Sequence, residues 1–379
     1  MWFCQTGFWF GLISFPLYLW HWPLLSFTRI VDDDTPSNYT LIVVVLASVV
    51  LAWLTYKLIE KPLRFGNYGK SKTIGMAVLM VVVGYVGYYT YTRDGLEFRS
   101  KDRSGFLRYF ENARPEMRYF EKINLLTAWR DECEYFDFQK YRENTLVGGA
   151  ANSAPRDSID KACFERNKKF EKAVMIWGDS HAQQLAPGLK SNLPPNWQLL
   201  QIASSGCNPN IYEDSPSSKI QCVQSNYFAI KTIKEAKPDV VVVAQREGHT
   251  TEGFREIATR LKELGVPKVV FVGPTPHWTS ALPSIIARQL WEAKPRRTYV
   301  GIDGETLEIN NRLQREFHVD STQKYANVID LFCNKEGCIT YFGDDIASGI
   351  TAFDEGHLTP VASNYLAKEL LVKLITGKE

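Results

Sequence analysis

Long apolar stretches dominate the first quarter of the chain. Three of them follow one another, from Phe8 to Val31, from Tyr39 to Ile59 and from Thr73 to Tyr91. Each is long enough to cross a hydrocarbon core of about 30 Å at a helical rise of about 1.5 Å per residue. A single stretch of this kind fits a buried core helix, but three in succession favour membrane spans. We therefore predict three transmembrane helices within residues 1–93.

The charges between these stretches predict their orientation. The segment around the end of the second stretch is basic and contains Lys57, Lys61, Arg64, Lys70 and Lys72. The loop after the first stretch is acidic and contains Asp32, Asp33 and Asp34. Basic loops stay in the cytoplasm, whereas acidic residues have little influence. We expect a cytoplasmic N-terminus, with everything after the third stretch on the outer side of the membrane.

After residue 170 the pattern changes to short apolar runs that alternate with amphipathic segments. The apolar runs predict strands at Ala173–Trp177, Trp197–Ala203, Asp239–Ala244, Lys268–Gly273 and Asn327–Leu331. The other segments predict helices near residues 182–193, 227–236, 252–264, 307–317 and 361–375. Apolar strands separated by helices form parallel sheets that are covered on both faces. We expect a doubly wound α/β domain over residues 171–379, which would bind ligands at the carboxyl ends of its strands.

Residues 94–170 are charged and aromatic, with weak periodicity and a loop-like run at Val147–Asp157. We interpret them as a linker and an extension that packs on the α/β domain. The composition agrees with several units, because 379 residues exceed one ordinary domain. A mean hydropathy of −0.21 excludes a chain that is embedded in the membrane throughout. A net charge of +2 argues against a nucleic-acid partner, which would favour a basic excess.

Cysteines give an independent indication of an exported domain. Six of the seven lie beyond the predicted spans, namely Cys133, Cys163, Cys207, Cys222, Cys333 and Cys338. An even number in an oxidising compartment suggests disulfides, although six cysteines allow 15 pairings. We predict that nearest neighbours pair. A zinc site is the weaker alternative, because no C-x-x-C pair and no histidine at ligand spacing accompany these cysteines, and we expect no metal.

A short polar motif after the first predicted strand is a candidate for chemistry. Gly178, Asp179, Ser180 and His181 end this strand and open a helix. Ser180 would then stand near free backbone N–H groups, which favour a developing negative charge. The same residues also fit a simple helix N-cap, which needs no function.

A second polar motif precedes the closing helix. Asp354 and His357 are three residues apart in the run D-E-G-H-L-T. A histidine can take the proton of a serine while an aspartate orients the ring and stabilises the imidazolium. Alone this spacing is a weak signal. Together the two motifs, both on loops at strand ends, indicate a Ser-His-Asp site.

The G-D-S-H and D-x-x-H-L-T blocks resemble the first and last sequence blocks of SGNH hydrolases. This resemblance implies that Ser180 is the nucleophile, His357 the base and Asp354 its orienting group. It also implies an oxyanion hole formed by the backbone N–H groups of Ser180 and Gly206, because the run S-S-G-C at 204–207 resembles the second block. The asparagine of the third block is absent here, and Gln245 is the candidate for its place.

The apolar part carries a second resemblance. The runs Ile13–Pro23 and Tyr56–Arg64 resemble the closing helices of acyltransferase-3 membrane proteins. Such proteins, when fused to an SGNH domain, are bacterial O-acetyltransferases of surface glycans such as lipopolysaccharide O-antigen or peptidoglycan. The resemblance implies an inner-membrane protein with a periplasmic catalytic domain, a glycan or glycolipid acceptor, and no bound cofactor. The acyl donor would be acetyl-CoA or an acetyl group relayed through membrane helices.

Members of that family carry many more membrane helices than this chain. We therefore expect an N-terminally truncated form, or one that needs a separate chain to supply the earlier helices. His21 is the ionisable residue well inside the first predicted span, where a polar group is a functional candidate by default. An interfacial anchor is the alternative. Of the other candidates, we interpret His249 and His277 as loop or packing residues, Asp344 and Asp345 as an exposed turn, and Lys294–Arg297 as a solvated loop.

These observations leave three hypotheses of function. The first is a membrane-anchored O-acyltransferase that acts on a surface polysaccharide through an acyl-Ser180 intermediate. The second is a periplasmic carbohydrate esterase, in which the same residues use water as the acceptor. The third is a truncated remnant without independent activity.

Overall fold

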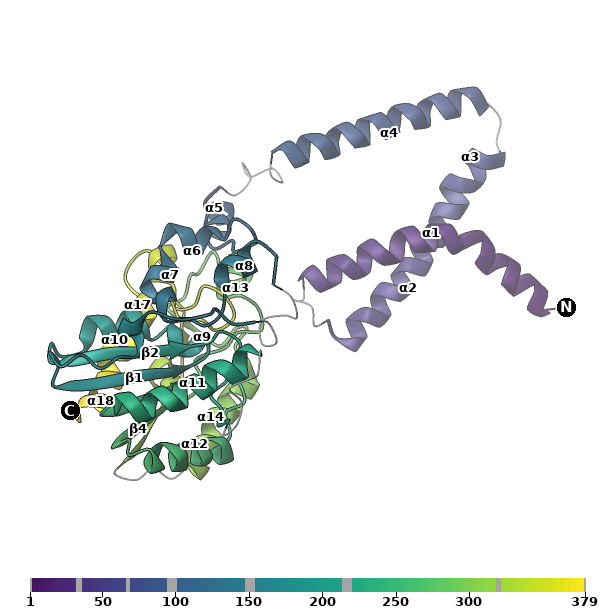
Figure 1. Cartoon of the computed structure of the whole chain (residues 1–379). Coiled ribbons are helices and arrows are strands. Elements are labelled where there is room, and N and C mark those ends of the chain that lie inside the picture. Colours follow the sequence, from purple (N-terminus) through teal and green to yellow (C-terminus); the bar gives the residue numbers. More distant parts are fainter. Residues whose placement is uncertain are drawn as a thin grey trace. The chain divides into compact units, whose positions relative to one another are not determined.

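The chain forms two compact units, Met1–Lys101 and Asp102–Glu379, in a computed structural model (Figure 1). The structure describes residues 2–31, 36–65, 69–93, 101–146, 154–212, 220–317 and 322–377. The predicted acidic loop at 32–34, the expected boundary near residue 93 and most of the loop-like run after Val147 lie at or beyond the edges of these ranges.

The first unit consists almost entirely of helices in its described residues. It contains α1 (Trp2–Val31), α2 (Asn38–Thr55), a π-helical turn (Tyr56–Glu60), α3 (Lys61–Phe65) and α4 (Gly69–Thr92). The side chain of Trp20 on α1 donates a hydrogen bond to Thr55 Oγ1 at the end of α2, over 2.8 Å. The segments Asn38–Arg64 and Gly69–Thr92 are long and apolar enough to cross a membrane. Helix α1 is not among them, so its role as a span stays a prediction.

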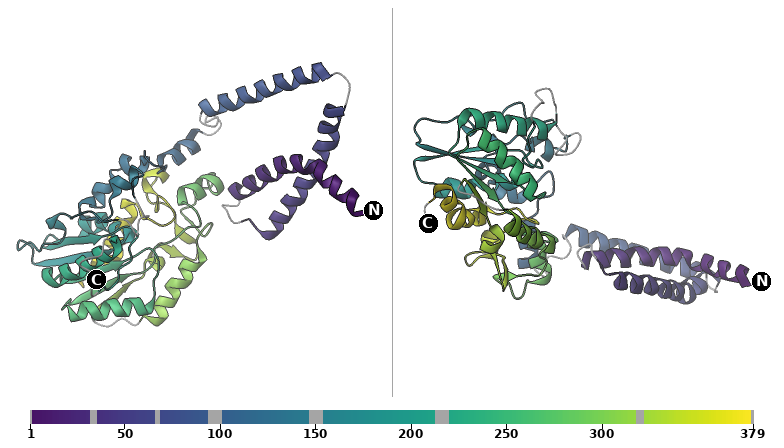
Figure 2. Two further views of the ribbon diagram at one scale, coloured as in Figure 1. Left: turned by 45° about the vertical axis from the view of Figure 1, so that its right-hand side comes forward. Right: turned by 90° about the horizontal axis from the view of Figure 1, so that it is seen from below.

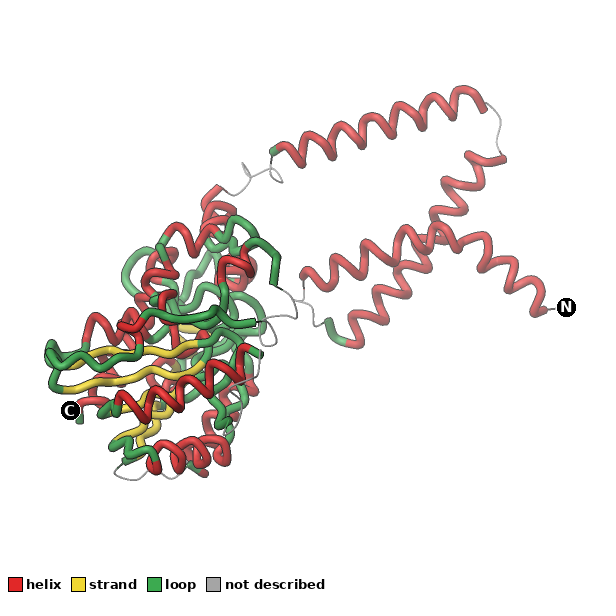
Figure 3. The backbone as a smooth tube through the Cα atoms, viewed as in Figure 1, coloured by secondary structure: helices red, strands yellow, loops and turns green. Residues whose placement is uncertain are grey.

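A five-stranded parallel sheet forms the centre of the second unit (Figures 1 and 3). Its strand order is β2-β1-β3-β4-β6. The strands are β1 (Lys172–Gly178), β2 (Trp197–Ala203), β3 (Val240–Ala244), β4 (Lys268–Val272) and β6 (Gln323–Ala326). Gly178 at the end of β1 is in register with Ala203 of β2 and Ala244 of β3. The carboxyl ends of the three strands therefore meet at one edge of the sheet, where we expect ligands.

Alternate residues of β1 build two hydrophobic cores, one on each face of the sheet. Met175 and Trp177 belong to the core beneath α11 (Gln221–Ala236), α12 (Thr251–Glu263) and α14 (Gly304–Glu316). Val174 and Ile176 belong to the opposite core, with α10 (Ala186–Asn192), α17 (Pro360–Leu366) and α18 (Val372–Thr376). Figure 2 shows the helices lying on both sides of the sheet. This confirms the predicted doubly wound α/β fold.

One predicted strand is wrong. Residues 328–332 form the helix α15 (Val328–Phe332), and the fifth strand is β6, directly before it. The side chain of Asn327 caps α15 by accepting a hydrogen bond from the Asp330 backbone N–H at 3.0 Å. Because β6 is an edge strand and only partly buried, it tolerates Gln323 and Lys324. These polar residues interrupt the apolar run from which a strand would be predicted.

Several short elements escape the sequence pattern. The predicted helix at 182–193 is divided into α9 (Ser180–Gln183) and α10. Helix α13 (Leu282–Gln289) and a small antiparallel sheet were not predicted. This second sheet has the order β5-β8-β7, with β5 (Arg297–Thr298), β7 (Cys333–Asn334) and β8 (Gly337–Ile339).

The extension packs on the α/β domain. Its helices are α5 (Lys101–Tyr109), α6 (Arg118–Lys122), α7 (Leu125–Ala128) and α8 (Phe138–Arg142), with short 3-10 turns at Asp131–Cys133 and Lys161–Cys163. A third core joins its Tyr119, Leu125 and Trp129 to Phe353. The Tyr135 N–H donates to the carbonyl oxygen of Ala203 at 3.0 Å, so the extension touches the end of β2.

Three disulfides join cysteines that are neighbours in the sequence. The bonds are Cys133–Cys163, Cys207–Cys222 and Cys333–Cys338. This is the predicted pairing. The first anchors the extension to itself, the second closes the loop after β2, and the third joins β7 to β8. Glu132, Cys133 and Cys163 lie close together, but this group consists of the first disulfide and one exposed carboxylate.

Candidate active site

The first motif turns sharply from β1 into α9. The backbone of Gly178 has φ +155°, and a Cβ atom there would lie 1.8 Å from the carbonyl oxygen of Ala244. Only glycine lets β1 and β3 approach so closely at this point. Asp179 then caps α9, because its side chain accepts a hydrogen bond from the His181 N–H over 2.7 Å. The helix cap is therefore Asp179, which leaves the hydroxyl of Ser180 available for another partner.

That partner is His357. Its Nε2 lies 2.8 Å from Ser180 Oγ, although the two residues are 177 positions apart in the sequence. Its Nδ1 lies 2.6 Å from Asp354 Oδ2. The structure thus brings together the three residues that the sequence singles out. A nucleophile, a base and an orienting carboxylate in hydrogen-bonded order are the arrangement used for acyl transfer.

The loop before α17 holds Asp354 by backbone hydrogen bonds. Asp354 Oδ1 accepts from the N–H groups of Gly356 at 3.0 Å and His357 at 2.7 Å. Burial alone would raise the pKa of Asp354, but His357 and these N–H groups outweigh it and hold the pKa below its usual value. Burial likewise opposes the protonated form of His357, yet the Asp354 carboxylate holds the pKa of His357 above its usual 6.5. The pair is therefore built to stabilise an imidazolium.

Asp179 links two strand ends beneath the nucleophile. Besides capping α9, it accepts a hydrogen bond from the Arg246 N–H over 2.7 Å. Burial raises the pKa of Asp179 to about 6, although the two backbone hydrogen bonds oppose that rise. The carboxylate fixes the loop after β3 against the loop after β1.

Two further histidines pack behind the base. The His181 ring lies 4.5 Å from His357 and 5.3 Å from His277, measured between centroids. Burial lowers the pKa of both His181 and His277, and the nearby His357 lowers them further. The residues His181 and His277 stay neutral beside the imidazolium that His357 would become. His277 is a packing residue, as expected, and it packs within this site.

The cavity in front of Ser180 has a volume of about 370 Å³. One side consists of strand-end residues, including Ser205, Gly206 and Arg246. The other side comes from the extension and is largely aromatic and apolar, with Met117, Phe120, Leu126, Trp129, Phe136, Phe138 and Tyr141. A cavity with apolar walls and a few polar groups at its base is typical of a binding site.

Comparison with known proteins shows the family to which the chain belongs. A family model described as the SGNH domain fused to AT3 domains matches residues 123–371. The chain belongs to this SGNH family. The match begins inside the extension and includes the whole parallel sheet.

Two known proteins are similar to parts of the chain. Peptidoglycan O-acetyltransferase OatA of Listeria monocytogenes serovar 1/2a is 38% identical over 67 residues, which are 17% of this chain and 11% of OatA. The periplasmic domain of the lipopolysaccharide acetyltransferase of Salmonella ser. Paratyphi A has the same fold, with a TM-score of 0.51. That match is 22% identical and covers 68% of this chain and 95% of the Salmonella domain.

The residues named for the oxyanion hole differ in their placement. Gly206 lines the cavity with Ser180 and has φ +78°, a left-handed conformation that favours glycine. The side-chain amide of Gln245 instead donates to the carbonyl oxygen of Glu247 over 2.9 Å and lines a separate hollow. The structure does not bring it to Ser180. Its neighbour Arg246 lines the catalytic cavity.

Glu134 is a buried carboxylate that the sequence analysis missed. It lines the same cavity, and only 2% of it is exposed. Its Oε1 accepts from the N–H groups of Phe136 at 2.8 Å and Ser205 at 2.9 Å, and its Oε2 accepts from Ser205 Oγ at 3.1 Å. Burial raises the pKa of Glu134 to about 7, despite these hydrogen bonds. A lone glutamate beside a cysteine in an irregular segment gives no recognisable motif.

The remaining candidates lie elsewhere. His21 on α1 has its Nδ1 3.0 Å from the carbonyl oxygen of Leu17 and its ring against Tyr18, and its role stays a prediction. Asp345 caps α16 (Ile346–Gly349) through Ser348.

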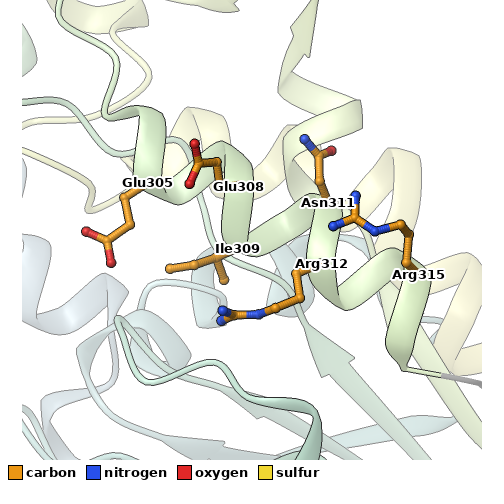
Figure 4. Close-up of a pocket in the computed structure, with 6 residues that line it drawn as sticks. All are labelled: Glu305, Glu308, Ile309, Asn311, Arg312 and Arg315. Atoms are coloured by element: carbon orange, nitrogen blue, oxygen red, sulfur yellow. The ribbon is translucent and has the colours of Figure 1, made fainter.

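Another hollow, of about 420 Å³, follows the exposed face of α14 (Figure 4). It is lined by Glu305, Glu308, Ile309, Asn311, Arg312 and Arg315. Glutamates near the start of the helix and arginines near its end complement the helix dipole. None of these lining residues is a nucleophile, so we assign this hollow no part in the reaction.

Proposed function

We propose that the chain is a membrane-associated O-acetyltransferase of a bacterial surface polysaccharide, acting through an acetyl-Ser180 intermediate. The hydrogen-bonded series Ser180–His357–Asp354 at the base of a cavity carries the proposal. Membership of a family of SGNH domains fused to AT3 domains supports it. The names of the two relatives, both acetyltransferases of envelope glycans, agree with this assignment. The catalytic unit would lie in the periplasm, with the N-terminus in the cytoplasm.

In the first half-reaction, Ser180 Oγ attacks the carbonyl carbon of an acetyl donor. As the Oγ–C bond forms, the Ser180 proton moves to His357 Nε2 and the carbonyl oxygen becomes an oxyanion. The backbone N–H groups of Ser180 and Gly206 would stabilise this oxyanion. The tetrahedral carbon then expels the donor's leaving group, which takes the proton from His357, and acetyl-Ser180 remains.

In the second half-reaction, a sugar hydroxyl replaces the donor. His357 removes the hydroxyl proton while the sugar oxygen attacks the acetyl carbon. Collapse of the second tetrahedral intermediate breaks the bond to Ser180 Oγ, which recovers its proton from His357. The product is an O-acetylated sugar, and the enzyme returns to its initial state.

The aromatic side of the cavity is the proposed binding site for the acceptor sugar. Phe120, Phe138 and Tyr141 are half-buried, come from the extension and line the cavity together with Ser180. Rings of this kind provide large, rigid contact area for a sugar and exclude water from the acetyl ester. The acetyl group would come from acetyl-CoA or from a relay through membrane helices.

The test uses the full chain in membranes that contain an acetyl donor and a surface polysaccharide. We expect transfer of labelled acetyl groups to the polysaccharide, with acetyl-Ser180 detectable by mass spectrometry. Ser180→Ala should abolish both. Ser191→Ala, which changes an exposed serine bonded to its own helix, is the matched control and should retain both. Transfer that persists in Ser180→Ala would refute the mechanism. Ser180-dependent hydrolysis without any gain from added polysaccharide would assign an esterase instead.

A further inference from the structure

The loop that would form the oxyanion hole is held by a residue from outside the α/β domain. Ser204–Cys207 follows β2, and the Ser205 N–H and hydroxyl both donate to Glu134 of the extension. Gly206 is the next residue and lines the cavity with Ser180. The direction of the Gly206 N–H depends on the peptide between Ser205 and Gly206, because that peptide is planar.

The backbone of Glu134 is also held in place. Cys133, directly before it, forms the disulfide with Cys163, and the backbone of Glu134 makes a bridge with Ala203 at the end of β2. The Phe136 N–H donates to the same carboxylate oxygen as the Ser205 N–H. Three donors therefore converge on one buried side chain, which leaves it little freedom to move.

We propose that Glu134 is a positioning residue that fixes the oxyanion loop for the attack by Ser180. It acts through Ser205, without contact to the acyl group. The extension is then a part of the catalytic machinery as well as a cover for the sheet. This inference rests on the proposed Ser180 chemistry but not on the identity of the acceptor, because acetylation of Ser180 precedes both transfer and hydrolysis.

Three variants separate positioning from a general loss of structure. Glu134→Gln keeps the shape, and its amide can accept from both N–H groups and donate to the Ser205 hydroxyl. Glu134→Ala removes every hydrogen bond to the loop. Glu165→Ala removes an exposed extension carboxylate, 3.8 Å from Lys161, and serves as the control.

The measurement is turnover of p-nitrophenyl acetate by the detergent-solubilised full chain, with thermal unfolding recorded for each variant. At pH 8 we expect Glu134→Ala to lower kcat by about 100-fold, the loss typical of a displaced oxyanion donor, with little change in KM. Glu134→Gln should lower kcat by about fivefold at pH 8, because charge-assisted hydrogen bonds are roughly twice as strong as neutral ones. Glu165→Ala should match the wild type.

The pH profile gives a readout that a purely structural role would not change. The ionisable groups around Glu134 are Asp131, which pairs with Arg156, and those that share the cavity, namely Arg246, Asp354 and His357. Below pH 7 the wild type should lose kcat/KM more steeply than titration of His357 alone requires. Glu134→Gln should follow a single titration and converge on the wild type near pH 6. This comparison holds even if Glu134→Ala fails to fold.

Equal kcat values for Glu134→Ala and Glu165→Ala would overturn the positioning role. Equal, complete losses in folded Glu134→Gln and Glu134→Ala would also overturn it, because they would require the carboxylate itself in the chemistry. Absence of any Ser180-dependent turnover in the wild type would refute the acyl-enzyme mechanism and this role together. Turnover that depends on Ser180 and Glu134 without any acetylated polysaccharide would sustain the positioning role and refute only the transferase.

Discussion

His357 and Asp354 form the pair on which the proposed chemistry depends. The base must be neutral to take the Ser180 proton, and the Asp354 carboxylate holds the pKa of His357 above 6.5. We therefore predict that kcat/KM for p-nitrophenyl acetate rises with pH and that its midpoint lies above pH 6.5. A rate that is flat from pH 5 to 8 would exclude His357 as the base.

Removing the charge of the Asp354 carboxylate is a second test of the same pair. Asp354→Asn should lower kcat by about 10⁴-fold, the loss seen when the orienting aspartate of such a triad is replaced. Without the carboxylate, Asp179 alone opposes the effect of burial, so the pKa of His357 should fall and the midpoint of kcat/KM should move to lower pH. NMR titration of the His357 ring measures this directly. A midpoint that does not move would show that Asp354 is not the charge that sets the pKa of His357.

The buried charge of Glu134 should reduce stability at neutral pH. Its folded-state pKa is about 7, above the usual 4.5, so unfolding releases a proton between these values and stability falls as pH rises through this range. The full cost corresponds to about 3 kcal/mol of unfolding free energy. Glu134→Gln should therefore unfold at a higher temperature than the wild type at pH 8 and at the same temperature near pH 4. Equal unfolding temperatures of Glu134→Gln and the wild type at pH 8 would mean that burying the charged Glu134 carboxylate does not reduce stability.

The structure brings together those candidate residues that stand in sequence motifs. Ser180, Asp354 and His357 stand in short runs whose order and loop positions are informative. Glu134 gave no signal, because its role arises from tertiary contacts with Ser205. His277 was interpreted as a loop or packing residue, but its place beside His181 in the site could not be read from the sequence. Gln245 was named by its place after a strand, but the direction of a side chain on a loop depends on local hydrogen bonds that a strand pattern does not contain.

The loop after β2 contains both a disulfide and Gly206, a residue of the proposed oxyanion hole. The Cys207–Cys222 disulfide closes a segment of 15 residues directly after Gly206. Replacing both cysteines by alanine should cost about 3 kcal/mol of unfolding free energy, the value expected for a loop of this length. Because the loop also carries Gly206, kcat should fall while KM changes little. Replacement of Cys333 and Cys338 is the control and should leave kcat unchanged, since that disulfide lies in the second sheet. Equal effects of the two replacements on kcat would contradict the special role of the loop.

The aromatic side of the cavity should determine affinity for the acceptor. Phe138 begins α8 and stacks on Phe120 at 5.2 Å between ring centroids. Phe138→Ala should raise KM for the polysaccharide about tenfold, because aromatic anchors contribute strongly to binding, but leave turnover of p-nitrophenyl acetate within twofold. Tyr299→Ala, an exposed aromatic outside the cavity, is the control. If Phe138→Ala lowers turnover of both substrates equally, this side supports the fold and does not bind the acceptor.

Central and edge strands explain which elements a pattern can predict. The runs that form β1, β3 and β4 are buried on both faces, so they are apolar without interruption and easily recognised. The edge strand β6 is short and half-polar, and the apolar run of α15 directly after it imitates a strand. The first four strands along the chain, β1 to β4, were therefore predicted, whereas the last strand of the sheet was displaced by a few residues.

All residues of the proposed acetylation step belong to the second unit. Its sheet, both sheet cores, the extension core and the three disulfides lie within Asp102–Glu379. A unit with its own hydrophobic cores is expected to fold alone. We predict that residues 102–379 express as a cooperatively folding protein whose Ser180-dependent turnover of p-nitrophenyl acetate matches that of the full chain. Transfer of acetyl groups from a membrane-side donor to polysaccharide should require the full chain. Folding without turnover in the isolated unit would place part of the catalytic machinery in the first unit. Efficient transfer from a membrane-side donor by the isolated unit would remove the need for a membrane relay.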